Sequence, residues 1–169
     1  WRDHIAYFAA DYQVVSYDLL GHGDSASPMT LTDLSLYAGQ LCGLLDHLQI
    51  DKAAVVGFSI GGMINRRFAL DYKDRLSALA ILNSPHDRGD EAQILVEARA
   101  AAVRSEGAMA TMEAALERWF TDDYRTSHPD FMEMVRAWRR QVDAQSYAEA
   151  AWVLATGVKE LTRPTTPVN

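Results

Sequence analysis

Short apolar runs alternate along the first half of the chain with segments in which apolar residues recur at helical spacing. The runs at residues 13–17, 52–58 and 76–82 are too short for helices and are typical of buried strands. Residues 34–48 form one apolar helical stripe, and residues 60–72 repeat with the same period. Alternation of strand and helix predicts an α/β fold, in which a parallel sheet is flanked by helices.

Local signals predict two further helix features. Trp1, Ile5 and Phe8 have the spacing of an amphipathic helix, and residues 1–10 look like the end of that helix. Thr30 or Thr32 is expected to cap the following helix, because a side-chain oxygen there satisfies a free backbone N–H.

The pattern changes after residue 89, where the sequence becomes rich in alanine and loses its strand signals. We expect short helices at about 90–104, 108–120, 129–141 and 146–154. Gly107 suits the end of the first of these helices, and Pro129 suits the first turn of the third. This block is therefore predicted to be a helical insertion that follows a parallel strand.

These boundaries divide the chain into three parts. We predict a partial α/β core over residues 1–89, a helical lid (cap) over 90–155 and the start of a return to the core over 156–169. Most of the aromatic residues in the lid are expected to pack between helices. A minority of them would line a substrate pocket between the lid and the sheet.

Composition narrows the possible partners. The 169 residues amount to one domain, and their net charge of −7 argues against nucleic acid or an anionic membrane as a partner. The single cysteine, Cys42, allows no internal disulfide, and no metal or cofactor motif is present. No apolar run approaches the ~20 residues of a membrane span. We expect a cytoplasmic protein, but the chain opens on Trp1 without a methionine, so the lack of a signal peptide carries no weight.

The segment that organises the chain is Gly57-Phe58-Ser59-Ile60-Gly61, which joins a predicted strand to a predicted helix. A turn this sharp brings its backbone close to the neighbouring residues, which favours glycine on both sides. It would hold Ser59 in a strained conformation with its hydroxyl exposed at the edge of the sheet. The N–H of Ile60 would then face the oxygen that becomes negative during acyl transfer. The alternative is a structural turn with an unreactive serine.

A serine nucleophile needs a base and a group that orients the base. His22 lies in a loop at the strand edge where ligands bind, but a histidine between two glycines is more often a loop residue. Asp87 follows the third predicted strand and is a candidate acid, while His86 beside it is a weaker candidate base. His4, His47 and His128 lie in or near predicted helices and have no reason to face Ser59. The helix after Ser59 is expected to expose Arg66 and Arg67 to solvent.

Three segments resemble the α/β-hydrolase superfamily: Tyr17-Asp18-Leu19-Leu20-Gly21-His22-Gly23-Asp24-Ser25, Gly57-Phe58-Ser59-Ile60-Gly61-Gly62 and Leu79-Ala80-Ile81-Leu82-Asn83. Within that superfamily, Arg118-Trp119-Phe120-Thr121 looks like the lid of 3-oxoadipate enol-lactonases. The resemblance implies that Ser59 is the nucleophile and that the N–H of Ile60 is an oxyanion-hole donor. The implied substrate-contacting side chains are those of Phe58, Trp119, Phe120 and Trp138.

The resemblance also implies that some segments typical of the family are not recognisable in this sequence. Family members carry a second oxyanion donor after an earlier strand, an acid after the strand that follows the lid, and a histidine near the C-terminus. None of these segments is recognisable here, so the chain resembles the middle of a hydrolase. The strand that would precede Trp1 belongs between residues 13–17 and 52–58. We therefore expect those two strands not to pair and to lie roughly 9 to 10 Å apart, whereas 52–58 and 76–82 should pair in parallel.

These inferences predict an incomplete α/β-hydrolase. The parent protein would be a cofactor-independent serine hydrolase that acts on a small carboxylic ester or lactone through an acyl-enzyme. One alternative is a non-catalytic ligand-binding member of the same fold. Another is a relative of the haloperoxidases or of the hydrolases that break C–C bonds. The sequence leaves the oligomeric state open.

Overall fold

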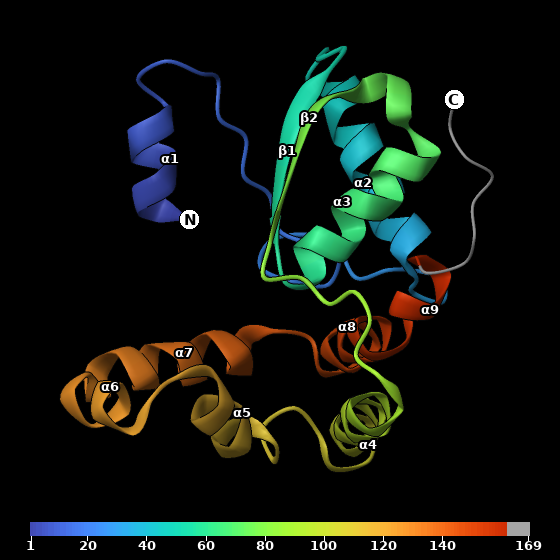
Figure 1. Ribbon diagram of the computed structural model, residues 1–169. Coiled ribbons are helices and arrows are strands. Elements are labelled where there is room, and N and C mark those ends of the chain that lie inside the picture. The colour runs from blue at the N-terminus through green and yellow to red at the C-terminus, as the bar shows by residue number, and fades with distance from the viewer. Residues whose placement is uncertain (162–169) are drawn as a thin grey trace.

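The computed structural model describes residues 1–161, and its first half contains a small parallel sheet with helices packed on one face (Figure 1). The elements of this half are α1 (Arg2–Phe8), α2 (Leu34–His47), β1 (Ala53–Phe58), α3 (Ile60–Asp71), the 3-10 turn η1 (Lys73–Arg75) and β2 (Leu76–Leu82). β1 and β2 pair in parallel, with Val55 opposite Leu79 and Phe58 opposite Leu82. The predicted parallel pairing of these two strands is therefore confirmed.

Helices α2 and α3 cover one face of the sheet. Leu41 and Leu45 of α2 pack with Phe68 of α3 against Val55 of β1. The other face of β1 is open, because Val56 and Phe58 are about half exposed. The apolar run of β1 predicts a strand buried on both faces, and within the described residues only one face is covered.

The prediction of a strand at residues 13–17 is wrong. The segment is irregular, and Val14 and Val15 are exposed by 36% and 41% instead of buried. A strand forms only where a neighbour accepts and donates its backbone hydrogen bonds, and no described segment pairs with this one. The expectation that it does not pair with β1 is confirmed for the described residues.

Helix α1 forms where predicted but contains no buried residue. The predicted N-cap of α2, Thr30 or Thr32, is wrong. Asp33 caps the helix instead, and its carboxylate accepts a hydrogen bond of 2.7 Å from the N–H of Leu36. Thr32 is instead buried, and its hydroxyl has no partner among the described groups.

The second half of the described chain is entirely helical. Its helices are α4 (Asp90–Glu106), α5 (Met112–Trp119), α6 (Asp122–Ser127), α7 (Pro129–Gln141), α8 (Ala144–Thr156) and α9 (Val158–Leu161). Gly107 ends α4 with a φ of 94°, and Pro129 occupies the first turn of α7, as the sequence predicts. Helix α6 is an addition to the prediction; the hydroxyl of Thr121 caps it by accepting from the N–H of Tyr124. We call residues 90–156 (α4–α8) the helical layer.

The helical layer lies below the carboxyl ends of β1 and β2 in Figure 1. Its distal part has a core of its own, in which Met112 and Leu116 of α5 pack against Met132 of α7. Its proximal part joins the main core, because Val153 of α8 packs in the same cluster as Leu34 of α2. No helix within residues 1–161 is both long enough and apolar enough to cross a membrane.

The junction between the two halves is held by side chains from the β2–α4 connection and from the first turn of α4. Arg88 donates to the carbonyl oxygens of Leu154 at 2.8 Å and Ala155 at 3.3 Å. Gln93 of α4 donates to the same Ala155 oxygen at 2.8 Å. These bonds satisfy carbonyl groups at the end of α8 that have no partner within the helix, and they place a cation where the helix dipole favours one.

Candidate active site

Ser59 lies in the turn between β1 and α3, at the carboxyl edge of the sheet. Its backbone has φ 54° and ψ −118°, a conformation that side-chain-bearing residues rarely adopt. The turn is fixed on both sides, since the N–H of Ser59 donates to the carbonyl of Leu82 at 3.0 Å and its own carbonyl accepts from Gly62 at 3.0 Å. The strained strand-turn-helix geometry predicted from the sequence is present.

The glycines around the turn have different roles. A Cβ on Gly57 would lie 2.3 Å from the carbonyl oxygen of Gly61 and 2.6 Å from the Nδ2 of Asn65, so this position admits only glycine. A Cβ on Gly61 would meet no described atom within 4 Å. Gly62 is the second sterically required glycine, because a Cβ there would lie 2.5 Å from the Cβ of Ser84. The prediction that Gly61 is sterically required is thus corrected to Gly62.

The N–H of Ile60 is the first of α3, so the helix offers it no acceptor. It points from the positive end of the helix dipole, where a developing negative charge is stabilised. The local geometry is therefore suited to a hydroxyl nucleophile at Ser59 and an oxyanion beside it.

Two buried polar side chains near the turn escaped the sequence analysis. Asn65 is buried beside Gly57, and its amide nitrogen has no partner among the described groups. Ser84 packs against Gly62 with its hydroxyl also unpartnered. The sequence signal for Ser84 was its position two residues after the end of β2, on the same sheet edge as Ser59.

No hydrogen bond joins Ser59 to a histidine within residues 1–161. His22 contacts the carbonyl of Leu20 through its Nδ1 at 3.1 Å, and its ring lies 6.4 Å from that of Tyr147. His86 lies 3.3 Å from the guanidinium of Arg66. The described chain therefore brings neither candidate base into contact with the serine.

The remaining candidates make local contacts. His4 stacks edge-on with Trp1, His47 ends α2, and His128 stacks on Tyr124 at the start of α7. The carboxylate of Asp87 accepts from the N–H of Gly89 at 3.0 Å. Within residues 1–161, no three His, Cys, Asp or Glu side chains are arranged to hold a metal ion.

The sequence predicts that Arg66 faces solvent, and the structure shows that it does not. It is half-buried, donates to the carbonyl of Pro85, and has a buried Nε without a partner among the described groups. Burial lowers the pKa of Arg66. Arg67, by contrast, forms a two-bond ion pair with Asp71, at 2.7 Å for each bond.

The four aromatic candidates fall into two groups. Phe58, Trp119 and Trp138 are exposed by 52%, 53% and 50%, a large open area for such side chains. Phe120 packs inside the helical layer, where its ring stacks on Tyr124 at 5.6 Å and meets Phe131 at 5.8 Å. Its contacts give Phe120 a role in packing.

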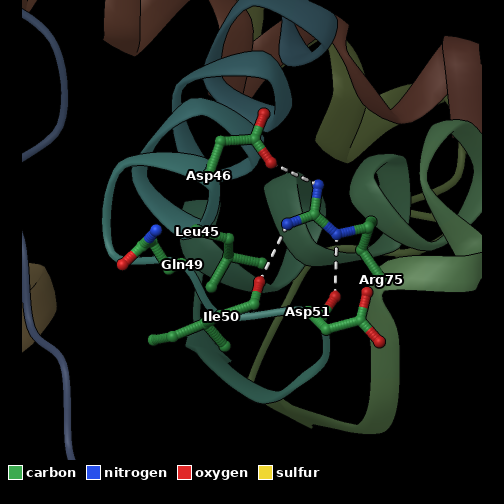
Figure 2. A pocket seen from close by; sticks show the side chains of 6 residues that line it. All are labelled: Leu45, Asp46, Gln49, Ile50, Asp51 and Arg75. Atoms are coloured by element: carbon green, nitrogen blue, oxygen red, sulfur yellow. Dashed lines mark hydrogen bonds and ion pairs between the residues drawn. The ribbon is translucent and has the colours of Figure 1, made fainter.

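A surface depression lies at the amino ends of β1 and β2, away from Ser59, and it has a structural explanation. Figure 2 shows Arg75 reaching across it to Asp46 at 2.6 Å and to the carbonyl oxygens of Ile50 and Asp51 at 2.9 and 2.8 Å. These bonds tie the start of β2 to the loop before β1. Because Ser59 follows the other end of β1, this depression is not part of the candidate site.

Residues 1–168 match the α/β-hydrolase fold family, and the chain belongs to that family. It is similar to 3-oxoadipate enol-lactonase 2 of Acinetobacter baylyi, with 34% identity over 92% of this chain and 57% of the relative. Among solved structures it resembles the enol-lactonase of Burkholderia xenovorans LB400, with 30% identity and a TM-score of 0.80 over 92% of this chain and 59% of that one. A malate-bound thermophilic esterase from Thermogutta terrifontis has 26% identity and a TM-score of 0.79 over 92% and 58%. The chain thus spans less than three-fifths of the length of these relatives.

Proposed function

We propose that the complete protein is a serine hydrolase that cleaves a small carboxylic ester or lactone through an acyl-enzyme. The observation that carries the proposal is the conformation of Ser59, φ 54° and ψ −118°, directly before the free N–H of Ile60 at the start of α3. The likeness to enol-lactonases and to an esterase supports an ester or lactone as the bond that is broken.

In this reaction the hydroxyl oxygen of Ser59 attacks the carbonyl carbon of the substrate while a base takes the hydroxyl proton. The negative oxygen of the tetrahedral intermediate accepts a hydrogen bond from the N–H of Ile60. The intermediate collapses to an acyl-serine as the alkoxide side leaves with a proton; in a lactone it stays tethered to the acyl group. Water then releases the acid and restores the serine.

The base and its orienting acid are assigned to parts of the complete protein outside residues 1–161. Two observations support this assignment: no described histidine contacts Ser59, and the relatives extend well beyond the stretch that matches. Within the described residues, Phe58 at the end of β1 and Trp119 and Trp138 in the helical layer remain the proposed substrate contacts. Phe120 is left out because it packs inside that layer.

The test is turnover of 4-nitrophenyl acetate and of a small lactone by the complete protein and its Ser59→Ala variant. The variant should fold normally and lose at least about 10⁴-fold in kcat, because only binding and oxyanion stabilisation remain. A burst of 4-nitrophenol equal to the enzyme concentration would reveal the acyl-enzyme. Equal turnover by both proteins would refute the proposal, and binding of esters without turnover would favour the non-catalytic alternative.

A further inference from the structure

The backbone takes an uncommon conformation at three positions other than glycine within residues 1–161. These are Gln49, Ser59 and Asn83, with φ angles of 57°, 54° and 43°. Gln49 lies in the loop before β1, whereas Ser59 directly follows β1 and Asn83 directly follows β2. Two of the three positions are therefore at the carboxyl edge of the sheet, which faces the helical layer (Figure 1). Backbone strain of this kind clusters at functional sites.

The register of the sheet places Asn83 beside the proposed nucleophile. Phe58 lies opposite Leu82 in the parallel pair. The N–H of Ser59 donates to the carbonyl oxygen of Leu82 at 3.0 Å, so the ladder continues past the end of β1. That carbonyl belongs to the peptide group that joins Leu82 to Asn83. Since paired strands lie about 4.8 Å apart, Asn83 begins within about one strand spacing of Ser59.

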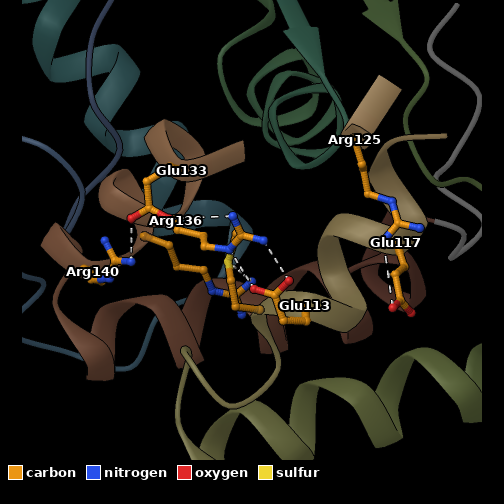
Figure 3. A network of polar contacts seen from close by, with 8 residues as sticks. Glu113, Glu117, Arg125, Glu133, Arg136 and Arg140 are labelled. Atoms are coloured by element: carbon orange, nitrogen blue, oxygen red, sulfur yellow. Dashed lines mark hydrogen bonds and ion pairs between the residues drawn. The ribbon is translucent and has the colours of Figure 1, made fainter. Parts of the chain in front are cut away.

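The side chain of Asn83 has no partner among the described groups. It is exposed, and its amide makes no hydrogen bond within residues 1–161. Polar side chains of the helical layer, by contrast, are often paired; Figure 3 shows Arg136, which donates two hydrogen bonds to Glu113. Ser84, the next residue, packs against Gly62. The amide of Asn83 is thus left available to a bound molecule.

The conformation of Asn83 does not by itself require an amide. Asparagine tolerates a positive φ better than most residues, but glycine adopts it at no steric cost. What glycine lacks is a hydrogen-bond donor at the edge of the sheet. The nitrogen of an asparagine side chain carries two N–H groups and no charge. It can therefore bind a neutral oxygen of a substrate.

An ester has two oxygens whose charge changes during the reaction. In the proposed acylation the carbonyl oxygen accepts a hydrogen bond from the N–H of Ile60, at the start of α3. The other is the alkoxy oxygen, or the ring oxygen of a lactone, and it gains negative charge as its bond to the acyl carbon breaks. A donor held beside Ser59 stabilises that charge as it develops, which lowers the barrier.

We propose that the side-chain amide of Asn83 donates a hydrogen bond to the alkoxy oxygen of the bound ester, or to the ring oxygen of a lactone, and assists its departure. The proposal rests on the proposed function for its reaction. The C–O bond breaks with its electron pair on that oxygen, which takes the proton that the base removed from Ser59. Asn83 keeps both of its amide protons. The assistance is greatest for a basic alkoxide and smallest for 4-nitrophenolate, which carries its negative charge without help.

The test compares kcat/KM of the complete protein for ethyl butyrate and 4-nitrophenyl butyrate, which share one acyl group and differ in the leaving group. Asn83→Gly keeps the positive φ and removes the amide. It should lower kcat/KM for ethyl butyrate about ten- to a hundredfold, and by much less for 4-nitrophenyl butyrate. Asn83→Asp keeps the size but replaces the donor by a carboxylate, and it should cause the same selective loss. A merely structural role would lower both rates alike.

Gln49→Gly is the matched control. It also places glycine at a positive φ, but in the loop before β1, at the opposite end of the strand from Ser59. Both rates should be unchanged in this variant. A ratio of the two rates that is the same in Asn83→Gly as in the unaltered protein would overturn the proposal, because the positive φ alone would then account for this residue.

A second measurement separates this contact from the reaction. If the complete protein hydrolyses neither ester, the proposed function fails, and ethyl butyrate is then titrated into Ser59→Ala with and without Asn83→Gly. Saturable binding that weakens about threefold or more with Asn83→Gly would support the contact, because one hydrogen bond is lost. Binding that is absent, or that is independent of Asn83, would overturn the contact as well.

Discussion

The turn at Ser59 is built from backbone contacts, whereas the distal part of the helical layer is held by side chains. At the turn, Gly57 and Gly62 let the chain approach within distances that no side chain permits, so its geometry follows from very few positions. In the distal layer, a small core around Leu116 is surrounded by exposed ion pairs such as Arg136 with Glu113. We infer that the turn tolerates almost no substitution, while the layer tolerates exchange at its surface and can vary in what it binds.

The largest effect on turnover is expected from substitution of the glycines in the Ser59 turn. Gly57→Ala would force the carbonyl of Gly61 or the turn itself to move, at a cost of about 1–3 kcal/mol or more in unfolding free energy. A displacement of Ser59 by about 1 Å would lower kcat about a hundredfold. Gly61→Ala is the matched control, since its Cβ meets no described atom and alanine favours helix by up to about 1 kcal/mol. Thermal unfolding and ester turnover of both variants test the contrast, and equal effects would contradict it.

In the helical layer the expected effect on turnover is smaller, although the effect on local stability is as large or larger. Leu116→Ala empties part of the distal core and should cost about 2–5 kcal/mol of local stability. Hydrogen exchange of the α5 and α7 amides should accelerate while that of β1 stays slow. Trp119→Ala should leave this exchange unchanged and alter the relative rates for different esters, because the ring is 53% exposed. If Trp119→Ala instead destabilised the layer without changing ester preference, the ring would be a packing residue.

The smallest effect is expected from the ion pair between Glu113 and Arg136. The hydrogen bond from Arg136 holds the pKa of Glu113 below its usual value, and the nearby charge acts in the same direction. A lowered pKa in the folded state means that the pair stabilises the protein above the unfolded pKa of about 4.3 and is lost as the pH falls through the folded value. Glu113→Gln should therefore cost less than about 1 kcal/mol at pH 7, and the cost should shrink as the pH falls through the lowered pKa of Glu113. A cost that stayed the same as the pH fell, or in 1 M salt, would show that packing, not charge, is responsible.

Local signals were enough to predict much of this fold. The alternating pattern gave the parallel pair β1 and β2 and the strained turn at Ser59, and Gly107 and Pro129 marked helix ends correctly. These features depend on residues that are close in sequence. The helix in residues 122–127 escaped because six residues are too few to show a helical period.

The errors in the strand and the glycine predictions involve contacts between distant segments. Residues 13–17 have a strand pattern but no described neighbour to pair with. The need for glycine at position 62 comes from Ser84, which lies across the sheet edge. The burial of Arg66 likewise depends on the loop after β2, where it donates to the carbonyl of Pro85. No pattern along the chain distinguishes Arg66 from Arg67 beside it, which pairs with Asp71.

The reactivity of Ser59 is tested most directly by treating the complete protein with a serine-directed fluorophosphonate and analysing its peptides by mass spectrometry. A strained, partly exposed serine beside a free helix N–H should take up one phosphonyl group per chain, on the peptide that contains Ser59, and the Ser59→Ala variant should take up none. A complete protein that hydrolyses esters while Ser59 stays unmodified, or that carries the label on another serine, would contradict the assignment of Ser59 as nucleophile.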